Sequence, residues 1–221
     1  MYGTMGDMNA DQVAALRVLL APTGWLDRTR YFARTLRDCS RTPQGLLVVG
    51  TPTDEPWHMT AHLADEARLA QLPELAPTLV RWAPPPGAPA HLRVGLDRLA
   101  AAGRSETLLV VSPGATSEEL LERVSDVRRA GATIFSLDRG DPELGALAHE
   151  ALAVPESTAP LSFDAAQHLV TAAAGDSPPG TGRARPVPGG SARPVPGGSS
   201  LRSRLAQLLD TVSGPPPGSA D

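Results

Sequence analysis

The chain has 221 residues and a formal net charge of −4, and all 20 of its basic residues are Arg, which excludes a lysine Schiff base and a P-loop lysine. Residues 1–174 have a net charge of −6, and an acidic body repels phosphate, so a non-specific nucleic-acid binder is not expected. One cysteine, Cys39, excludes a disulfide within the chain, and no apolar run approaches the ~20 residues that cross a bilayer.

The first residues lack the basic and apolar regions of a secretory signal, so we expect a cytoplasmic protein without membrane contact. The use of Arg in place of Lys favours a GC-rich genome, such as that of an actinobacterium. It therefore says little about chemistry.

Residues 1–44 are predicted to form an N-terminal helical segment. Two helices are expected between residues 9 and 38, and a turn signal at 21–24 separates them. Asn9 or Asp11 can cap the first helix, and the second contains Trp25, Phe32 and Leu36.

From residue 45 the pattern changes to short apolar runs that alternate with helical stretches. Strands are predicted at 45–50, 78–82, 107–111, 132–137 and 151–154. Helices are predicted at 56–71, 90–103, 117–130, 142–150 and 164–174, with Asp164 as a possible cap of the last. This alternation predicts an α/β fold for residues 45–174, a three-layer αβα sandwich with a five-stranded parallel sheet.

The tail has a different composition. Residues 175–221 contain 9 Pro and 9 Gly, and the sequence ARPVPGGS occurs at 184–191 and again at 192–199. This composition predicts that residues 175–199 are a disordered linker. Residues 200–221 are predicted to be a short helix and tail.

An amphipathic pattern follows the linker. Its apolar stripe consists of Leu201, Leu205, Leu208, Leu209 and Val212. A lone helix of ~13 residues is marginal in water, so this stripe calls for a partner protein. Arg202 and Arg204 lie in the first turn, where cations oppose the helix dipole, and they indicate an acidic docking groove. The alternative is a tail with no role.

The carboxyl ends of the strands are where a parallel sheet binds ligands. Three loops are therefore candidates: 50–55, 112–117 and 138–141. In the second, Ser112, Gly114, Thr116 and Ser117 can bind an anion at a helix N-terminus. The alternative, which does not exclude the first, is a capping box with Thr116 as N-cap and Glu119 reaching back.

Residues 107–154 resemble a sugar isomerase (SIS) domain. The similarity rests on a strand, a loop S-P-G-A-T, a helix, the strand GATIFSLD, a small helix and the strand ALAVPE. Residues 45–106 match the first half of that domain only in layout, and residues 163–170 are similar to the closing helix of some members.

The resemblance implies a parallel sheet, a homodimer and a sugar-phosphate site that includes Gly50, Thr51 and the 112–117 loop. Two departures weaken that site. The 112–117 loop is one residue short of the family pattern and lacks its middle serine. The 50–55 loop contains Pro52, which has no N–H, and Asp54 and Glu55, which repel a dianion.

Three histidines are further candidates. His58 and His62 are four residues apart on one helix face, a spacing that zinc sites use, but no third ligand is identifiable and a solvated polar face is expected instead. His168 lies in the closing helix, where the resemblance implies an acid or base; a structural role is the alternative. No metal and no cofactor are predicted.

Three functions remain open. The first is a non-catalytic SIS-like module that docks a partner protein through residues 200–212. The second is an aldose–ketose phosphate isomerase with the anion on residues 112–117 and His168 as acid or base. The third is a sensor that binds a sugar phosphate or nucleotide without turnover.

Overall fold

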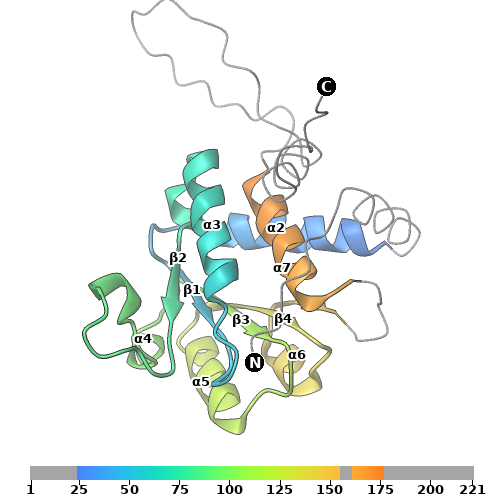
Figure 1. The fold of residues 1–221 in the computed structure, drawn as a ribbon. Coiled ribbons are helices and arrows are strands. Elements are labelled where there is room, and N and C mark those ends of the chain that lie inside the picture. The colour runs from blue at the N-terminus through green and yellow to red at the C-terminus, as the bar shows by residue number, and fades with distance from the viewer. Residues whose placement is uncertain (1–23, 155–160, 177–221) are drawn as a thin grey trace, which may run out of the picture.

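The strands form one sheet, all parallel, in the order β2-β1-β3-β4-β5 (Figure 1). The computed structural model describes residues 24–154 and 161–176. The strands are β1 (Leu46–Val49), β2 (Pro77–Val80), β3 (Thr107–Ser112), β4 (Thr133–Asp138) and β5 (Glu150–Ala153). The predicted α/β class and five-stranded parallel sheet are confirmed.

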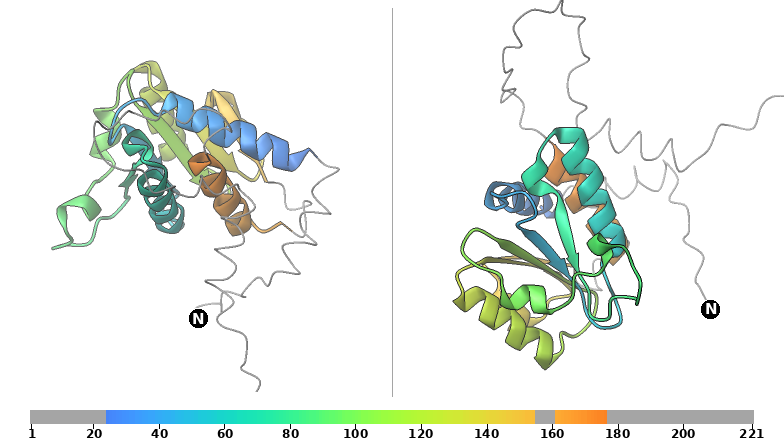
Figure 2. Two further views of the ribbon diagram at one scale, coloured as in Figure 1. Left: turned by 90° about the horizontal axis from the view of Figure 1, so that it is seen from above. Right: turned by 90° about the vertical axis from the view of Figure 1, so that its left-hand side faces the viewer.

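Helices cover both faces of the sheet, which gives three layers (Figures 1 and 2). One face carries α2 (Trp25–Cys39), α3 (Trp57–Ala70) and α7 (Phe163–Gly175). The other carries α4 (Asp97–Ala100), α5 (Glu118–Arg129) and α6 (Pro142–Leu147). The 3-10 segments η2 (Pro73–Leu75) and η3 (Ala90–Leu92) lie in the connections. None of the helices within the described ranges has the length and apolar character that a membrane span requires.

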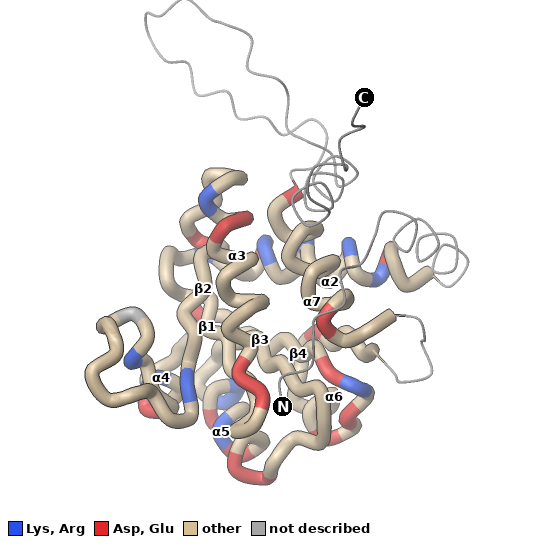
Figure 3. The backbone as a smooth tube through the Cα atoms, viewed as in Figure 1, with Lys and Arg blue, Asp and Glu red and all other residues tan. Residues whose placement is uncertain are grey.

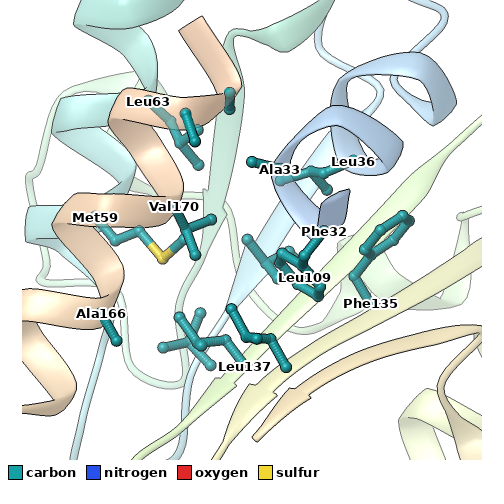
Figure 4. Close-up of a cluster of buried hydrophobic side chains, with 14 of the residues drawn as sticks. Phe32, Ala33, Leu36, Met59, Leu63, Leu109, Phe135, Leu137, Ala166 and Val170 are labelled. Atoms are coloured by element: carbon teal, nitrogen blue, oxygen red, sulfur yellow. The ribbon is translucent and has the colours of Figure 1, made fainter. Parts of the chain in front are cut away.

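The two cores follow from the two-residue period of a strand, because successive side chains point to opposite faces. On β1, Leu46 and Val48 belong to the core between the sheet and α2, α3 and α7. Leu47 and Val49 belong to the core between the sheet and α4, α5 and α6. The first core includes an edge-to-face contact of Phe32 on α2 with Phe135 on β4, with ring centroids 5.4 Å apart (Figure 4). Helix α2, which precedes position 45, is therefore packed against the sheet.

The predicted helix at 90–103 is largely wrong. The structure has only the 3-10 segment η3 and a single helical turn, α4, in this stretch. The backbone N–H of Arg81 donates to the carbonyl of Val94, and Arg81 forms a parallel bridge with Gly95 beyond the end of β2. Val94 and Gly95, which the apolar pattern assigned to a helix, thus pair with the backbone at the end of β2.

Two helix caps also differ from prediction. Ser162, not Asp164, is the N-cap of α7, because its hydroxyl accepts from the backbone N–H of Ala165. Ser117, not Thr116, is the N-cap of α5, and Glu119 forms an ion pair with Arg123 instead of reaching back. The helix predicted from Asn9 or Asp11 and the linker and helix predicted beyond residue 176 lie outside the described residues.

Candidate functional site

The sheet has a switch point between β1 and β3. From β1 the chain crosses to α3 on one face, whereas from β3 it crosses to α5 on the other. The loops after these two adjacent strands therefore diverge at the carboxyl edge, where parallel sheets bind ligands. The edge loops, defined here as residues 50–56, 113–117 and 139–141, contain or adjoin every ligand-binding residue predicted from the sequence.

The loop after β1 is closed on itself. The backbone N–H of Thr51 donates to the carbonyl of Asp54 at 3.2 Å, and the N–H of Asp54 donates to the Thr51 hydroxyl at 3.1 Å. The indole N–H of Trp82 donates to the carbonyl of Gly50 at 2.8 Å. A Cβ at Gly50 would lie 2.0 Å from the Asp54 carbonyl oxygen, so only glycine fits. Two N–H groups that a phosphate would need are thus already used within the loop.

Glu55 ends the same loop and pairs with Arg81. The guanidinium Nε of Arg81 donates to the Glu55 carboxylate at 2.8 Å, and both side chains are about four-fifths buried, with relative exposures of 21% and 19%. The Arg81 guanidinium, a cation close to the edge loops, is therefore neutralised by the Glu55 carboxylate. Arg81 is consequently held by protein rather than presented to an anionic ligand.

The loop after β3 is built from short polar side chains. The Ser112 hydroxyl donates to the carbonyl of Gly114 at 2.8 Å, and the Thr116 hydroxyl donates to Ser112 Oγ at 3.3 Å. Ser112 is fully buried at the end of β3, whereas Gly114 is exposed. Ser117 caps α5. The structure therefore brings Ser112, Gly114, Thr116 and Ser117 together as predicted, and two hydrogen bonds join the hydroxyl groups of Ser112 and Thr116 and the carbonyl of Gly114 to one another.

The third edge loop supplies a carboxylate to the second. Oδ2 of Asp141 accepts a hydrogen bond of 3.0 Å from the backbone N–H of Thr116. Oδ1 of the same side chain accepts from the backbone N–H groups of Glu143 and Leu144, and so caps α6. An internal carboxylate thus lies where an anion bound by the Thr116 N–H would have to lie.

Hydrogen bonds determine the charge state of Asp141. Burial acts to raise the pKa of this carboxyl, but the hydrogen bonds from Thr116, Leu144 and Glu143 outweigh it and hold the pKa below its usual value. Asp141 is therefore a carboxylate at neutral pH, as the geometry of its three donors requires.

A second acidic side chain, Asp138, lies next to Asp141 and is hydrogen-bonded to its backbone. It is 2% exposed at the end of β4, and its Oδ1 accepts from the backbone N–H groups of Gly140 and Asp141. Together with Asp54 and Glu55, it makes the carboxyl edge of the sheet acidic (Figure 3). The sequence predicted acidic side chains that repel an anion only in the 50–55 loop. The structure adds acidic side chains at the end of β4 and in the loop that follows it.

Three histidines from two helices form a cluster beside these loops. His58 and His62 lie on α3, and His168 on α7 brings its ring to 5.0 Å and 4.6 Å from theirs, centroid to centroid. The Nε2 atoms of His58 and His62 are 2.9 Å apart. Sequence spacing indicated the first two but not the third, because the only signal for His168 was its place in the closing helix.

Burial and mutual repulsion lower the pKa of two of these rings, those of His62 and His168. Burial, then repulsion from His62 and His58, lowers the pKa of His168 to about 4. Burial and His58 also lower the pKa of His62, against a smaller opposite effect of Asp65. At neutral pH each of these two rings is therefore a neutral imidazole with one lone-pair nitrogen.

Two cavities lie elsewhere. The larger, about 450 Å³, opens at the amino ends of the strands between Gln44, Thr78, Arg98 and Glu106. The smaller, about 250 Å³, lies between α2 and β5 beside Tyr31. Neither is lined by an edge loop. The predicted docking residues Leu201, Arg202, Arg204, Leu205, Leu208, Leu209 and Val212 lie outside the described part of the chain.

Comparisons with known proteins give structural likenesses only. No protein family profile matches the chain. No curated protein matches it either.

Three solved structures are similar to the chain. A predicted phosphosugar isomerase from Salmonella typhimurium LT2 has 12% identity and a TM-score of 0.44 over 66% of this chain and 43% of that one. A predicted phosphosugar isomerase from Silicibacter pomeroyi DSS-3 has 16% identity and a TM-score of 0.49 over 92% and 54%. A predicted sugar-binding protein from Salmonella typhimurium LT2 has 16% identity and a TM-score of 0.38 over 71% and 49%.

The chain thus spans about half the length of each of these proteins. Their names agree with the sugar isomerase resemblance of residues 107–154. At TM-scores below 0.5, the ligand and chemistry of this chain have to be inferred from its own residues.

Proposed function

We propose that this chain is a non-catalytic binding module with an SIS-like domain, which binds no sugar phosphate at its edge loops and docks a partner protein through residues 200–212. The observation that carries the proposal is the hydrogen bond from the Thr116 N–H to the Asp141 carboxylate. A sugar phosphate would have to displace that carboxylate, and Asp141 would lose one of its three donors.

Electrostatics oppose the displacement. Two unit negative charges ~5 Å apart repel by about 3 kcal/mol at an effective dielectric of ~20. The edge loops and the end of β4 contribute Asp54, Glu55, Asp138 and Asp141, while Arg81 is paired with Glu55. The third edge loop also contains a cation, Arg139, whose guanidinium lies over the Phe163 ring, 5.4 Å from its centroid. The four carboxylates at this edge still outnumber the guanidinium groups of Arg81 and Arg139, so a phosphate dianion would meet net repulsion.

His168 is poorly suited to acid–base chemistry. Proton transfer is most efficient when the pKa of the catalytic group is close to the working pH. The pKa of His168 is lowered to about 4, and its ring packs edge-on against His58 and His62. This environment supports a role other than isomerisation.

The partner-docking part rests on the sequence pattern of residues 175–212. A random-coil linker of ~25 residues spans roughly 25–30 Å, so the apolar stripe can reach well beyond the surface of its own domain. The stripe needs a partner to be stable as a helix, and helix-in-groove docking uses anchors at this spacing. The homodimer implied by the SIS resemblance stays a prediction.

Titration of sugar phosphates tests the first part. We expect no thermal shift and no binding heat for the full chain with hexose and pentose phosphates up to about 10 mM, a range that would reveal Kd values of millimolar or tighter. A saturable shift would overturn this part. If that shift were also weakened by a Thr116→Pro variant, which lacks the N–H, it would favour the sensor; turnover in addition would favour the isomerase.

Paired substitutions test the second part. The double variant Leu205→Asp, Leu209→Asp places charge on the stripe, whereas Ser203→Asp, Gln207→Asp adds the same charge on the opposite side of the predicted helix. We expect the first to abolish co-purification of a specific protein from the native cytoplasm and the second to retain it. Equal co-purification with both variants would contradict docking through the stripe.

A further inference from the structure

We propose that His58, His62 and His168 form a binding site for a divalent transition-metal ion, with Zn²⁺ as its simplest occupant. The three residues each offer one ring nitrogen, and these atoms all lie within 4.8 Å of one another. This site is separate from the edge loops and does not depend on the proposed function.

The separations are close to those of a metal site. Zn–N bonds of about 2.0–2.1 Å in a tetrahedron place neighbouring ligand nitrogens about 3.3 Å apart. The His58 and His62 nitrogens are 2.9 Å apart and the widest separation in the group is below 4.8 Å. The proposal requires the wider separations to close by up to about 1.5 Å through rotation of the imidazole side chains.

Two packed helices hold the ligands. His58 and His62 lie four apart on α3, which places both rings on one face. Each directly precedes a core residue, Met59 or Leu63, and on α7 His168 stands two residues from Ala166 and from Val170. Figure 4 shows these core side chains pointing from α3 and α7 into the same cluster. Ligands on rigid elements with buried neighbours are pre-organised, which favours binding.

The ligand set selects the class of ion. Imidazole nitrogen suits Zn²⁺, Cu²⁺, Ni²⁺ and Co²⁺, whereas Mg²⁺ and Ca²⁺ require oxygen ligands. The only cysteine, Cys39, lies at the end of α2 and is not in the group. Asp65 on α3 and Asp164 on α7 are close enough to act on the rings electrostatically, and their charge favours a bound cation.

Three protein ligands leave a fourth position for water or an anionic ligand. All three histidines are half-buried, so solvent reaches the group. Trp57, which is 65% exposed, stacks on His58 with ring centroids 5.3 Å apart. An exposed aromatic ring beside an open metal position is an arrangement that can contact a bound ligand.

The full chain, purified without a histidine tag and stripped with chelator, tests the site. We expect Zn²⁺ to bind at one ion per chain with micromolar or tighter affinity in competition with a chromophoric chelator, and Co²⁺ to give the intense visible absorption of a four-coordinate nitrogen site. Loss of one ligand in His168→Ala or His62→Gln should weaken binding at least about a hundredfold, since even outer-shell changes cost 10–100-fold.

His149→Ala is the matched control, because it removes an imidazole that lies outside the cluster. It should bind Zn²⁺ like the unchanged chain. If a variant fails to fold, two measurements on the unchanged chain still test whether the site binds metal. These are the Co²⁺ spectrum and the rise in Tm on addition of Zn²⁺. Binding weaker than about 100 μM, or equal loss in His149→Ala and His168→Ala, would overturn the site.

Discussion

The backbone N–H of Thr116, at the start of the helix after β3, donates a 3.0 Å hydrogen bond to the carboxylate of Asp141, in the loop after β4. This contact joins two loops that follow adjacent strands of the sheet. A phosphate group at the N-terminus of α5 would use the same N–H group. The anion that this chain provides for that position is therefore one of its own side chains.

Substitution of Asp141 should reveal its structural role. Asp141→Ala removes the acceptor for Thr116 and the cap of α6, so we expect a loss of about 1–3 kcal/mol in the free energy of unfolding. Asp141→Asn keeps an acceptor oxygen and should lose less. Urea denaturation measures both, with the neighbouring exposed Glu143→Gln as control. Equal stability of Asp141→Ala and the unchanged chain would show that the contact contributes nothing.

The Arg81–Glu55 pair should be coupled. Glu55→Ala leaves a mostly buried guanidinium without its carboxylate, so we expect a loss of about 1–3 kcal/mol. The double variant Glu55→Ala, Arg81→Ala should be more stable than the sum of the single effects predicts. A double-mutant cycle by chemical denaturation gives this coupling, and strictly additive effects would contradict it.

The contact of Phe32 with Phe135 should stabilise the packing of α2 on the sheet. Both rings are almost fully buried, so Phe32→Ala should cost about 3–5 kcal/mol, whereas Phe32→Leu should cost much less. Tyr31→Ala, at an exposed neighbouring position, is the control and should be close to neutral. A similar small effect for Phe32→Ala and Tyr31→Ala would mean that α2 contributes little to the core.

The histidine cluster should make stability depend on pH in the metal-free chain. Unfolded His168 takes up a proton near its ordinary pKa of about 6.5, whereas burial, with His62 and His58, holds the folded pKa at about 4. The unfolded state binds more protons between these values, so stability is full above the upper value and falls as the pH is lowered.

Tm measured in chelator between pH about 7 and about 5, above the range in which most carboxylates titrate, checks this sign. His168→Gln cannot take up the proton and should flatten the slope. An equal slope in the two proteins would assign the pH dependence to other groups. The lowered pKa of His62 acts in the same direction, so some slope should remain in the variant.

The strands were predictable because each is a short apolar run bounded by turn signals. The run at β1, for example, is buried on both faces, as a central strand of a parallel sheet requires. The helix predicted at 90–103 failed because Val94 and Gly95 pair with the end of β2, and apolar spacing does not show such a long-range backbone contact. Ser117 and Ser162 replaced their predicted neighbours as caps, which shows that cap positions are uncertain by a residue or two.

The candidate sites were predictable only in part. The position of the three loops follows from the sequence, because carboxyl ends of parallel strands meet at one edge, and so does the acidic character of the 50–55 loop. The bond from Thr116 to Asp141 does not, since it depends on the separation of two loops. The contact of His168 with His58 and His62 could not be predicted from the sequence either, because it depends on the packing of α7 beside α3.

The amide resonance of Thr116 is the most direct test of the central claim. In a ¹⁵N-labelled chain, it should follow the protonation of Asp141, with an apparent pKa below the usual aspartate value, and should not move when fructose 6-phosphate is added at neutral pH. The opposite result would be a saturable shift of the Thr116 resonance on addition of the sugar phosphate, after which the resonance no longer follows the protonation of Asp141. That result would contradict the claim that the chain's own carboxylate occupies this edge.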